Sequence, residues 1–105
     1  MNDSADAPPP GVGDAAVLRR TLTICNRRGL HARAAAKFVA LAERFGAQVD
    51  VVKDGQEISA RSIMGLMMLG AGLGATIELR AEGWDAKEAI DALAGLVEAG
   101  FHEQD

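Results

Sequence analysis

The chain lacks tyrosine and has one tryptophan, three phenylalanines and a single cysteine among its 105 residues. One cysteine, Cys25, excludes a disulfide within the chain and is typical of a reducing compartment. The longest apolar run, at 63–69, is too short to cross a membrane, and no signal-peptide pattern opens the chain. We therefore expect a small, soluble, cytoplasmic, single-domain protein whose core consists mainly of Ala, Val, Leu, Ile and Met side chains.

Excess basic charge is also absent, because the net charge is −4, and this argues against nucleic acid as the main partner. The charge is nevertheless uneven. Residues 17–37 hold six basic residues and no acidic one, whereas residues 82–105 hold seven acids and one base. An acidic or phosphorylated partner would be steered to the basic end. A chance fluctuation of solvated surface charge is the alternative reading.

Apolar spacing predicts four strands and three helices. Period-two alternation indicates strands near 18–25, 47–51, 57–60 and 75–81, and spacings of three and four indicate helices near 32–45, 63–69 and 86–99. Strands with one apolar face imply helices on one side only. We predict an α+β open-faced sandwich of order βαββαβα, with an antiparallel sheet in strand order 1-4-2-3 and three helices on one face. Residues 17–101 form the domain, flanked by a disordered proline-rich tail (1–16) and an acidic tail (102–105).

Several residues indicate where turns and helix ends lie. Asp54-Gly55 is a two-residue hairpin signal, and Gly46 is expected at the C′ position that ends the first helix. Ser62 is expected to cap the short helix. Asp85 with Glu88 resembles a capping box, and Trp84 occupies the position of a hydrophobic staple.

His31 is the residue whose position most favours chemistry. It lies between a glycine turn and an alanine-rich helix, where the helix dipole disfavours imidazolium and free N–H groups can receive an anion. A histidine there suits a neutral nucleophile that then carries a negative group. The N–H groups of Ala32 and Arg33, with the Arg33 guanidinium, could bind the oxygens of a phosphoryl group. A lone histidine is otherwise most often structural.

Other kinds of site find no support in the sequence. Two histidines and one cysteine do not form a metal-ligand cluster, and the Gly29 turn lacks the spacing of a nucleotide-binding loop. We expect neither a metal nor a cofactor.

The short helix at 63–69 is apolar on all sides and rich in methionine. One side can pack on the sheet while the other forms an adaptable docking surface. Methionines that merely fill gaps in the core are the alternative. A phosphate on Ser62 would place negative charge beside this surface.

Three motifs together resemble the histidine-containing phosphocarrier protein (HPr) family of the bacterial phosphotransferase system. They are G-L-H-A-R at 29–33 with A-A-K-F at 35–38, S-I-M-G-L-M-M-L-G at 62–70, and G-A-x-I-E-L at 74–79. The resemblance extends over residues 18 to about 101.

The resemblance implies a role for each motif. His31 would accept phosphate on Nδ1 from enzyme I and pass it to an enzyme IIA protein, with Arg33 stabilising the phosphate. Ser62 would be the serine that an HPr kinase/phosphorylase modifies in many members. Partner docking would involve the short helix through Ile63, Met64 and Met67. We expect a monomeric carrier, not an enzyme.

Asn26 and the ending A-G-F followed by acids resemble the nitrogen-related (NPr) branch more than the sugar-transport branch. The chain departs from the family at Ala34, where most members have proline, and in its proline-rich N-terminal tail. A binding module of the same fold that never transfers phosphate is the contrasting hypothesis.

Overall fold

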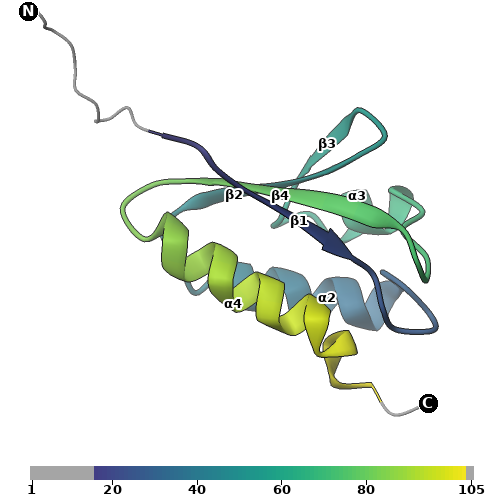
Figure 1. The fold of residues 1–105 in the computed structure, drawn as a ribbon. Helices are drawn as coiled ribbons and strands as arrows, with labels where there is room; N and C mark the ends of the chain where they lie inside the picture. The colour runs from purple at the N-terminus through teal and green to yellow at the C-terminus, as the bar shows by residue number, and fades with distance from the viewer. Residues whose placement is uncertain (1–15, 104–105) are drawn as a thin grey trace, which may run out of the picture.

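The computed structural model describes residues 16–103. The chain forms β1 (Leu18–Thr23), α2 (Ala32–Ala42), β2 (Gln48–Lys53), β3 (Gln56–Ser59), α3 (Ile63–Met68), β4 (Thr76–Glu82), α4 (Ala86–Glu98) and a short 3-10 turn, η2 (Gly100–His102). The four strands make one antiparallel sheet in the order β1-β4-β2-β3. Figure 1 shows α2 and α4 side by side beneath the sheet, with the other sheet face open. The predicted open-faced sandwich and its strand order are confirmed.

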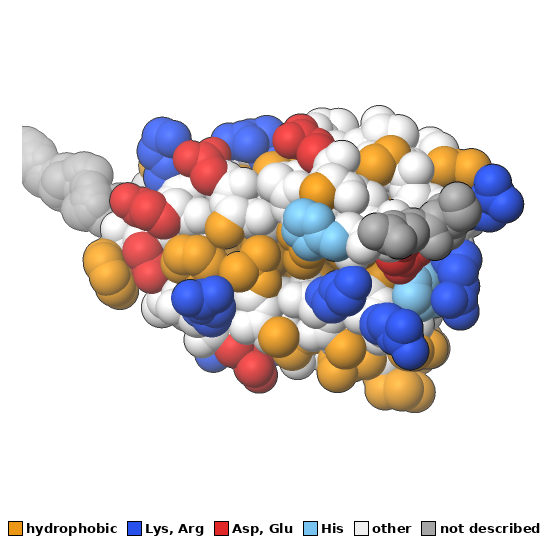
Figure 2. Space-filling model, turned by 90° about the horizontal axis from the view of Figure 1, so that it is seen from below, with side chains coloured by type: hydrophobic (Ala, Val, Ile, Leu, Met, Phe, Trp, Pro, Cys, Tyr) orange, Lys and Arg blue, Asp and Glu red, His pale blue; other side chains and the backbone are white. Residues whose placement is uncertain are grey.

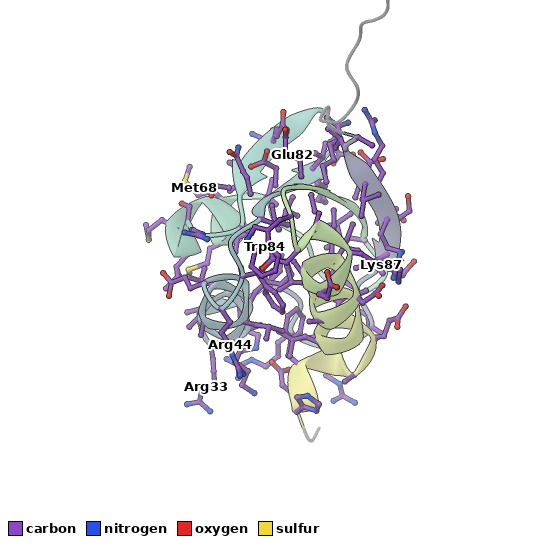
Figure 3. The ribbon with its side chains drawn as sticks, turned by 90° about the vertical axis from the view of Figure 1, so that its left-hand side faces the viewer. Arg33, Arg44, Met68, Glu82, Trp84 and Lys87 are labelled. Atoms are coloured by element: carbon purple, nitrogen blue, oxygen red, sulfur yellow. The ribbon has the colours of Figure 1, made fainter. Side chains whose placement is uncertain are left out.

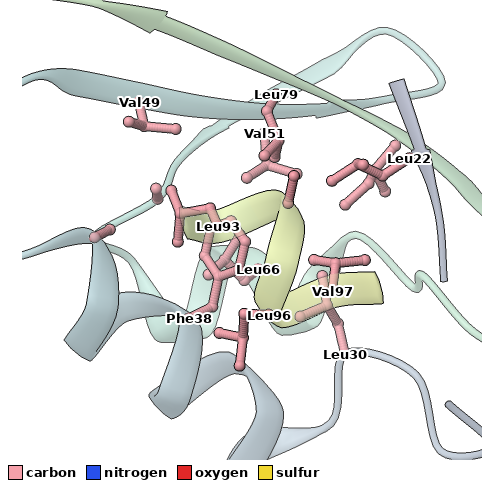
Figure 4. Close-up of a cluster of buried hydrophobic side chains, with 14 of the residues drawn as sticks. Leu22, Leu30, Phe38, Val49, Val51, Leu66, Leu79, Leu93, Leu96 and Val97 are labelled. Carbon is pink, nitrogen blue, oxygen red and sulfur yellow. The ribbon is translucent and has the colours of Figure 1, made fainter. Parts of the chain in front are cut away.

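The core lies between the sheet and the helices. The alternation predicted for the strands holds, because every second residue of β4 is buried and the residues between them are open to solvent in part or in full. Figure 4 shows the aliphatic strand residues facing Phe38 of α2 and Leu93 of α4. Leu66 of α3 is fully buried in the same cluster, so the short helix is anchored to the core by one residue. The other apolar side chains of α3 are exposed to solvent and do not contribute to the core.

Two local predictions are confirmed by the backbone. Asp54 and Gly55 both have positive φ, 51° and 82°, as a tight type I′ hairpin turn requires. The Ser62 hydroxyl accepts a hydrogen bond from the N–H of Gly65 at 3.0 Å and so caps α3.

The first helix ends earlier than predicted, at Ala42 and not near Phe45. Arg44 and Phe45 turn the chain with bonds to carbonyls three residues back, 3.1 and 3.2 Å long. Gly46 lacks the positive φ of a C′ residue. Its lack of a side chain has another cause, because a Cβ there would lie 2.7 Å from Nε1 of Trp84.

The predicted capping box before α4 is wrong. Asp85 makes no capping bond to its own helix and instead accepts the N–H groups of Gly46 at 2.9 Å and Ala47 at 2.7 Å. The buried carboxylate therefore joins the β4–α4 connection to the α2–β2 connection. Trp84 is not a staple either, since 88% of its surface is exposed.

The C-terminal end turns back toward the core. Gly100 ends α4 with φ 62°, Phe101 is fully buried, and Lys37 donates to the Phe101 carbonyl at 2.7 Å. These contacts direct Glu103 toward the start of α2. The proposed N-terminal tail lies outside the described residues apart from Ala16, as do the last two residues of the acidic tail.

Candidate functional site at the start of helix α2

His31 is the N-cap residue of α2, as the sequence predicted. Its backbone is extended, with φ −72° and ψ 177°, and its carbonyl accepts the first helical bond from Ala35 at 2.8 Å. The turn before it depends on Gly29, which has φ 64° and lies so close to the backbone of Ala71 that a Cβ would be 2.4 Å from that carbonyl oxygen. Leu30 donates to the same carbonyl at 2.9 Å. His31 is thus placed by a turn tied to the α3–β4 connection.

The first turn of α2 offers unused hydrogen-bond donors. The N–H groups of Ala32, Arg33 and Ala34 make no hydrogen bond to any atom of residues 16–103. Arg33 is exposed, and Figure 3 shows its side chain at the periphery of the molecule. Its guanidinium has no ion-pair partner in the described part of the chain. An anion beside His31 would therefore meet available backbone and side-chain donors.

Glu103 completes the site and was not anticipated as part of it. Its carboxylate contacts Nε2 of His31, and only 15% of the histidine side chain and 12% of the glutamate side chain are exposed. The other carboxylate oxygen accepts the amide N–H of Asn26 at 3.1 Å. The same amide donates to the Gly29 carbonyl at 2.9 Å, so Asn26 joins Glu103 to the turn that places His31. The amide oxygen of Asn26 is buried without a partner in the described residues.

The contact with Glu103 fixes which nitrogen of His31 is available. A carboxylate accepts hydrogen bonds and does not donate them, so the proton of the neutral ring lies on Nε2. The lone pair is then on Nδ1, which no donor among residues 16–103 contacts. The bond from His31 lowers the pKa of Glu103, and the Asn26 amide and the charge of Arg28 act in the same direction. The carboxylate therefore remains charged.

The surface around this site is basic on most sides. Arg27, Arg28 and Arg33 are exposed, and Lys37 is half-buried. Figure 2 shows the pale blue histidine side chains on the same face as several blue Lys and Arg side chains. The predicted positive end is present in part. Arg19 and Arg20, which were counted in it, lie near the start of β1, where Arg20 pairs with Asp91, and Glu103 adds an acid to the site.

The structure also gives α3 an exposed apolar surface. Ile63, Met64, Met67 and Met68 are 39%, 68%, 39% and 77% exposed. We call these four residues the α3 surface. The alternative, in which its methionines fill gaps in the core, does not hold, because among the α3 residues only Leu66 is buried.

Two further properties of the described residues concern metal ligation and membrane crossing. Between residues 16 and 103, no three His, Cys, Asp or Glu side chains group as metal ligands would. None of the helices in this part of the chain has the length and apolar character needed to span a bilayer.

Sequence reasoning found His31 and the donors after it but missed the role of Glu103. Asn26 was recognised only as a branch marker, not as the link between the turn and Glu103. The one signal for this contact is Gly100-Phe101, a helix-ending glycine followed by an apolar residue that can be buried. That pair predicts that the chain turns back to the core, but it does not predict that Glu103 then contacts His31.

Comparison with known proteins identifies the family of this chain. A family model described as "PTS HPr component phosphorylation site" matches residues 18–99. Phosphocarrier protein NPr of Shewanella violacea is 49% identical over 86 residues, which cover 82% of this chain and 94% of that protein. Phosphocarrier protein HPr of Cupriavidus necator is 48% identical over 87 residues, covering 83% and 98%. The crystal structure of HPr-C-His from Thermoanaerobacter tengcongensis matches with a TM-score of 0.80 at 46% identity, over 84% of this chain and 99% of that chain.

The fold thus agrees with a solved HPr structure, and the sequence matches relatives over almost their whole length. The NPr and HPr relatives are similar to the chain to the same degree. The chain belongs to the HPr family of phosphocarrier proteins of the phosphotransferase system.

Proposed function

We propose that the chain accepts a phosphoryl group on Nδ1 of His31 from phosphorylated enzyme I and passes it to an enzyme IIA protein in the cytoplasm. It acts as a protein substrate of transferases, not as an enzyme, and without a bound cofactor. The observation that carries this proposal is the contact between Glu103 and Nε2 of His31, which leaves an unprotonated Nδ1 beside the start of α2.

The transfer step needs only a nucleophile and donors for the transferred group. The Nδ1 lone pair forms a bond to phosphorus while the bond between phosphorus and the donor histidine nitrogen breaks, and its electron pair stays on that nitrogen. The modified ring of His31 becomes cationic. Glu103 at Nε2 stabilises that charge and keeps the ring in one orientation.

Ala32 and Arg33 supply the phosphate-binding groups in this proposal. Their N–H groups are unused by residues 16–103, and the helix dipole favours an anion beside them. The Arg33 guanidinium adds a charged fork that matches phosphate oxygens. Its exposure allows it to move toward the phosphoryl group when that group arrives.

The α3 surface is the proposed docking site for both protein partners, through Ile63, Met64 and Met67. Flexible methionines suit a surface that must bind two different proteins in turn. Because one chain carries both the nucleophile and this surface, we propose that a monomer suffices. Sedimentation of the full chain at assay concentrations checks the monomer, and a dimer there contradicts it.

Ser62 is the proposed regulatory site, modified by an HPr kinase/phosphorylase. Its hydroxyl caps α3, so a phosphate there would add charge at the edge of the docking surface. Incubation with such a kinase should label the chain, and Ser62→Ala should lose the label while Ser59→Ala keeps it. Undiminished labelling of Ser62→Ala contradicts this assignment.

For the branch we favour the nitrogen-regulatory one. Asn26 and the A-G-F ending support it, and Asn26 also binds the Glu103 carboxylate in the site. Phosphorylation by an enzyme I of the nitrogen type should be faster than by one of the sugar type. Equal or reversed rates would exclude this preference and leave the carrier function intact.

Phosphorylation from phosphoenolpyruvate tests the function itself. The full chain is incubated with enzyme I, phosphoenolpyruvate and Mg²⁺, and its intact mass is measured before and after acid treatment. We expect one acid-labile phosphate, lost in His31→Ala and kept in the matched variant His102→Ala. A label that survives His31→Ala contradicts the proposal. A chain that binds enzyme I but never gains phosphate is a binding module instead.

A further inference from the structure

Trp84 is the most exposed large apolar side chain of the described residues, at 88%. It lies in the connection between β4 and α4, and Figure 3, which faces this end of the molecule, shows it near the middle of the view with Arg44 below it. An indole held in this position contributes little to the core. Tryptophan is enriched at binding interfaces, where its ring offers a large apolar surface and its N–H a hydrogen-bond donor.

The indole adjoins a hollow in the surface. Its Nε1 lies so close to Gly46 that a Cβ on that glycine would be 2.7 Å away. Gly46 is also part of the lining of a hollow of about 300 Å³, whose other lining residues are Ala47, Gln48, Val49, Ser59 and Arg61. Trp84 therefore stands at the rim of the hollow, with indole surface free to contact another group.

Basic charge at this end lacks an acidic partner among residues 16–103. Arg44 and Arg61 are exposed and form no ion pair with a described carboxylate. The Arg61 guanidinium donates to the carbonyl of Phe45 at 2.9 Å and keeps further donors available. An occupant that carries carboxylates would complement both side chains.

The sheet begins at this same end with Leu18, the first residue of β1, so residues 1–15 precede β1 here in the sequence. Leu18 pairs with Ala81, which pairs with Val49 on the wall of the hollow. Two strand spacings, about 10 Å, therefore separate Leu18 from the hollow. Pro10 precedes Leu18 by eight residues, and an extended segment of that length spans about 26 Å.

The composition of this segment matches the surface. It holds three consecutive prolines, Pro8–Pro10, together with three aspartates, and it has no lysine or arginine. Consecutive prolines favour the polyproline II conformation, which docks on aromatic side chains at low entropic cost.

We propose that Trp84 and the hollow beside Gly46 form a docking site for the chain's own N-terminal segment. Pro8–Pro10 pack against the indole, and the aspartates of the segment lie near Arg44 and Arg61. This site goes beyond the proposed carrier function. It is separated from His31 by the eleven residues of α2, a helix about 16 Å long.

Fluorescence of the full chain reports on this site alone, because Trp84 is the only tryptophan and tyrosine is absent. We compare acrylamide quenching of the natural chain with that of a variant combining Pro8→Gly, Pro9→Gly and Pro10→Gly. Prolines stacked on one indole face should make the quenching constant of the natural chain about twofold lower and shift its emission to shorter wavelength. Val12→Ala, a change in the same segment that keeps the prolines, should behave as the natural chain does.

Equal quenching of the natural chain and the triple variant would overturn the proposal. Protection of Trp84 that appears only as protein concentration rises would also overturn it, since the segment would then come from a second copy. Far-UV circular dichroism of each variant verifies that the fold is unchanged. If the triple variant loses its circular dichroism signal, its change in quenching comes from unfolding and does not support the proposal.

Discussion

Glu103 contacts Nε2 of His31 across 72 residues of sequence. Two long-range features produce this contact. Phe101 is buried where α4 ends, and Asn26 binds the second carboxylate oxygen at 3.1 Å. The C-terminal segment therefore belongs to the site at the start of α2, and it determines which ring nitrogen of His31 is free to react.

Replacing the carboxylate by an amide should slow phosphorylation of His31. In Glu103→Gln the side chain keeps its size but loses the charge that holds the proton on Nε2, so we expect phosphoryl acceptance from enzyme I to fall about tenfold. Glu98→Gln, a change to an exposed glutamate of α4, is the matched control. The nitrogen chemical shifts of the His31 ring should show a larger share of the Nδ1-protonated form. Unchanged tautomer populations would contradict the assigned role of Glu103.

The same contact predicts how Glu103 titrates. The bond from His31 lowers the pKa of Glu103 below the ordinary glutamate value. At pH values above the ordinary glutamate pKa, the contact therefore stabilises the folded chain. This stabilisation is lost as the pH falls through the lowered pKa of Glu103. In His31→Ala, the pKa of Glu103 measured from its carboxyl ¹³C shift should rise toward the ordinary value. His102→Ala serves as the control, and an unmoved pKa in His31→Ala would exclude the bond as the cause.

The sequence predicts much of this fold because local patterns carry it. The alternation in β4 and the three-to-four spacing in α2 can each be recognised from residues close together in the sequence. The hairpin turn can be recognised from two residues, Asp54 and Gly55. The errors occur where distant segments compete for the same groups. In the sequence Asp85 resembles a cap for its own helix. In the structure its carboxylate instead accepts hydrogen bonds from the N–H groups of Gly46 and Ala47.

The residues of the candidate site also differ in whether local sequence predicts them. His31 and the donors of Ala32 and Arg33 follow from one turn and one helix start, so the sequence reveals them. Glu103 reaches the site only because Phe101 is buried and Lys37 binds its carbonyl at 2.7 Å. No local pattern predicts that packing.

Arg33 should matter for transfer and not for folding. It is exposed and makes no ion pair with residues 16–103, so Arg33→Ala should leave the free energy of unfolding within about 0.5 kcal/mol of the natural value. Loss of the charged fork should lower the rate of phosphoryl transfer about 10- to 100-fold. Arg44→Ala, in the turn that follows the same helix, is the control. Equal transfer rates in the two variants would contradict phosphate binding by Arg33.

Replacing two helical glycines, Gly65 and Gly95, by alanine should change the stability of the chain in opposite directions. A Cβ on Gly65 would lie 2.6 Å from Cγ2 of Ile58 and 2.8 Å from the Ser62 hydroxyl oxygen, so Gly65→Ala should strain α3 and lower the melting temperature. A Cβ on Gly95 would meet nothing within 4 Å, and Gly95→Ala should stabilise α4 by about 0.5–1 kcal/mol. Thermal unfolding followed by circular dichroism measures both. Stabilisation by Gly65→Ala would contradict the close packing of α3 on Ile58.

Ala34 stands where most family members have proline, and the structure predicts what restoring it does. The N–H group of Ala34 binds no atom of residues 16–103, so Ala34→Pro removes no hydrogen bond there and restricts the unfolded chain. We expect a gain in stability of about 0.4–1 kcal/mol. Ala36→Pro, one half-turn further into α2, is the matched control and should cost about 3 kcal/mol, because its N–H belongs to the helical ladder. Chemical denaturation of both variants separates these outcomes. If Ala34→Pro destabilises the chain as much as Ala36→Pro does, the fully buried surroundings of Ala34 have no room for the ring, and this chain has repacked the start of α2 around the smaller residue.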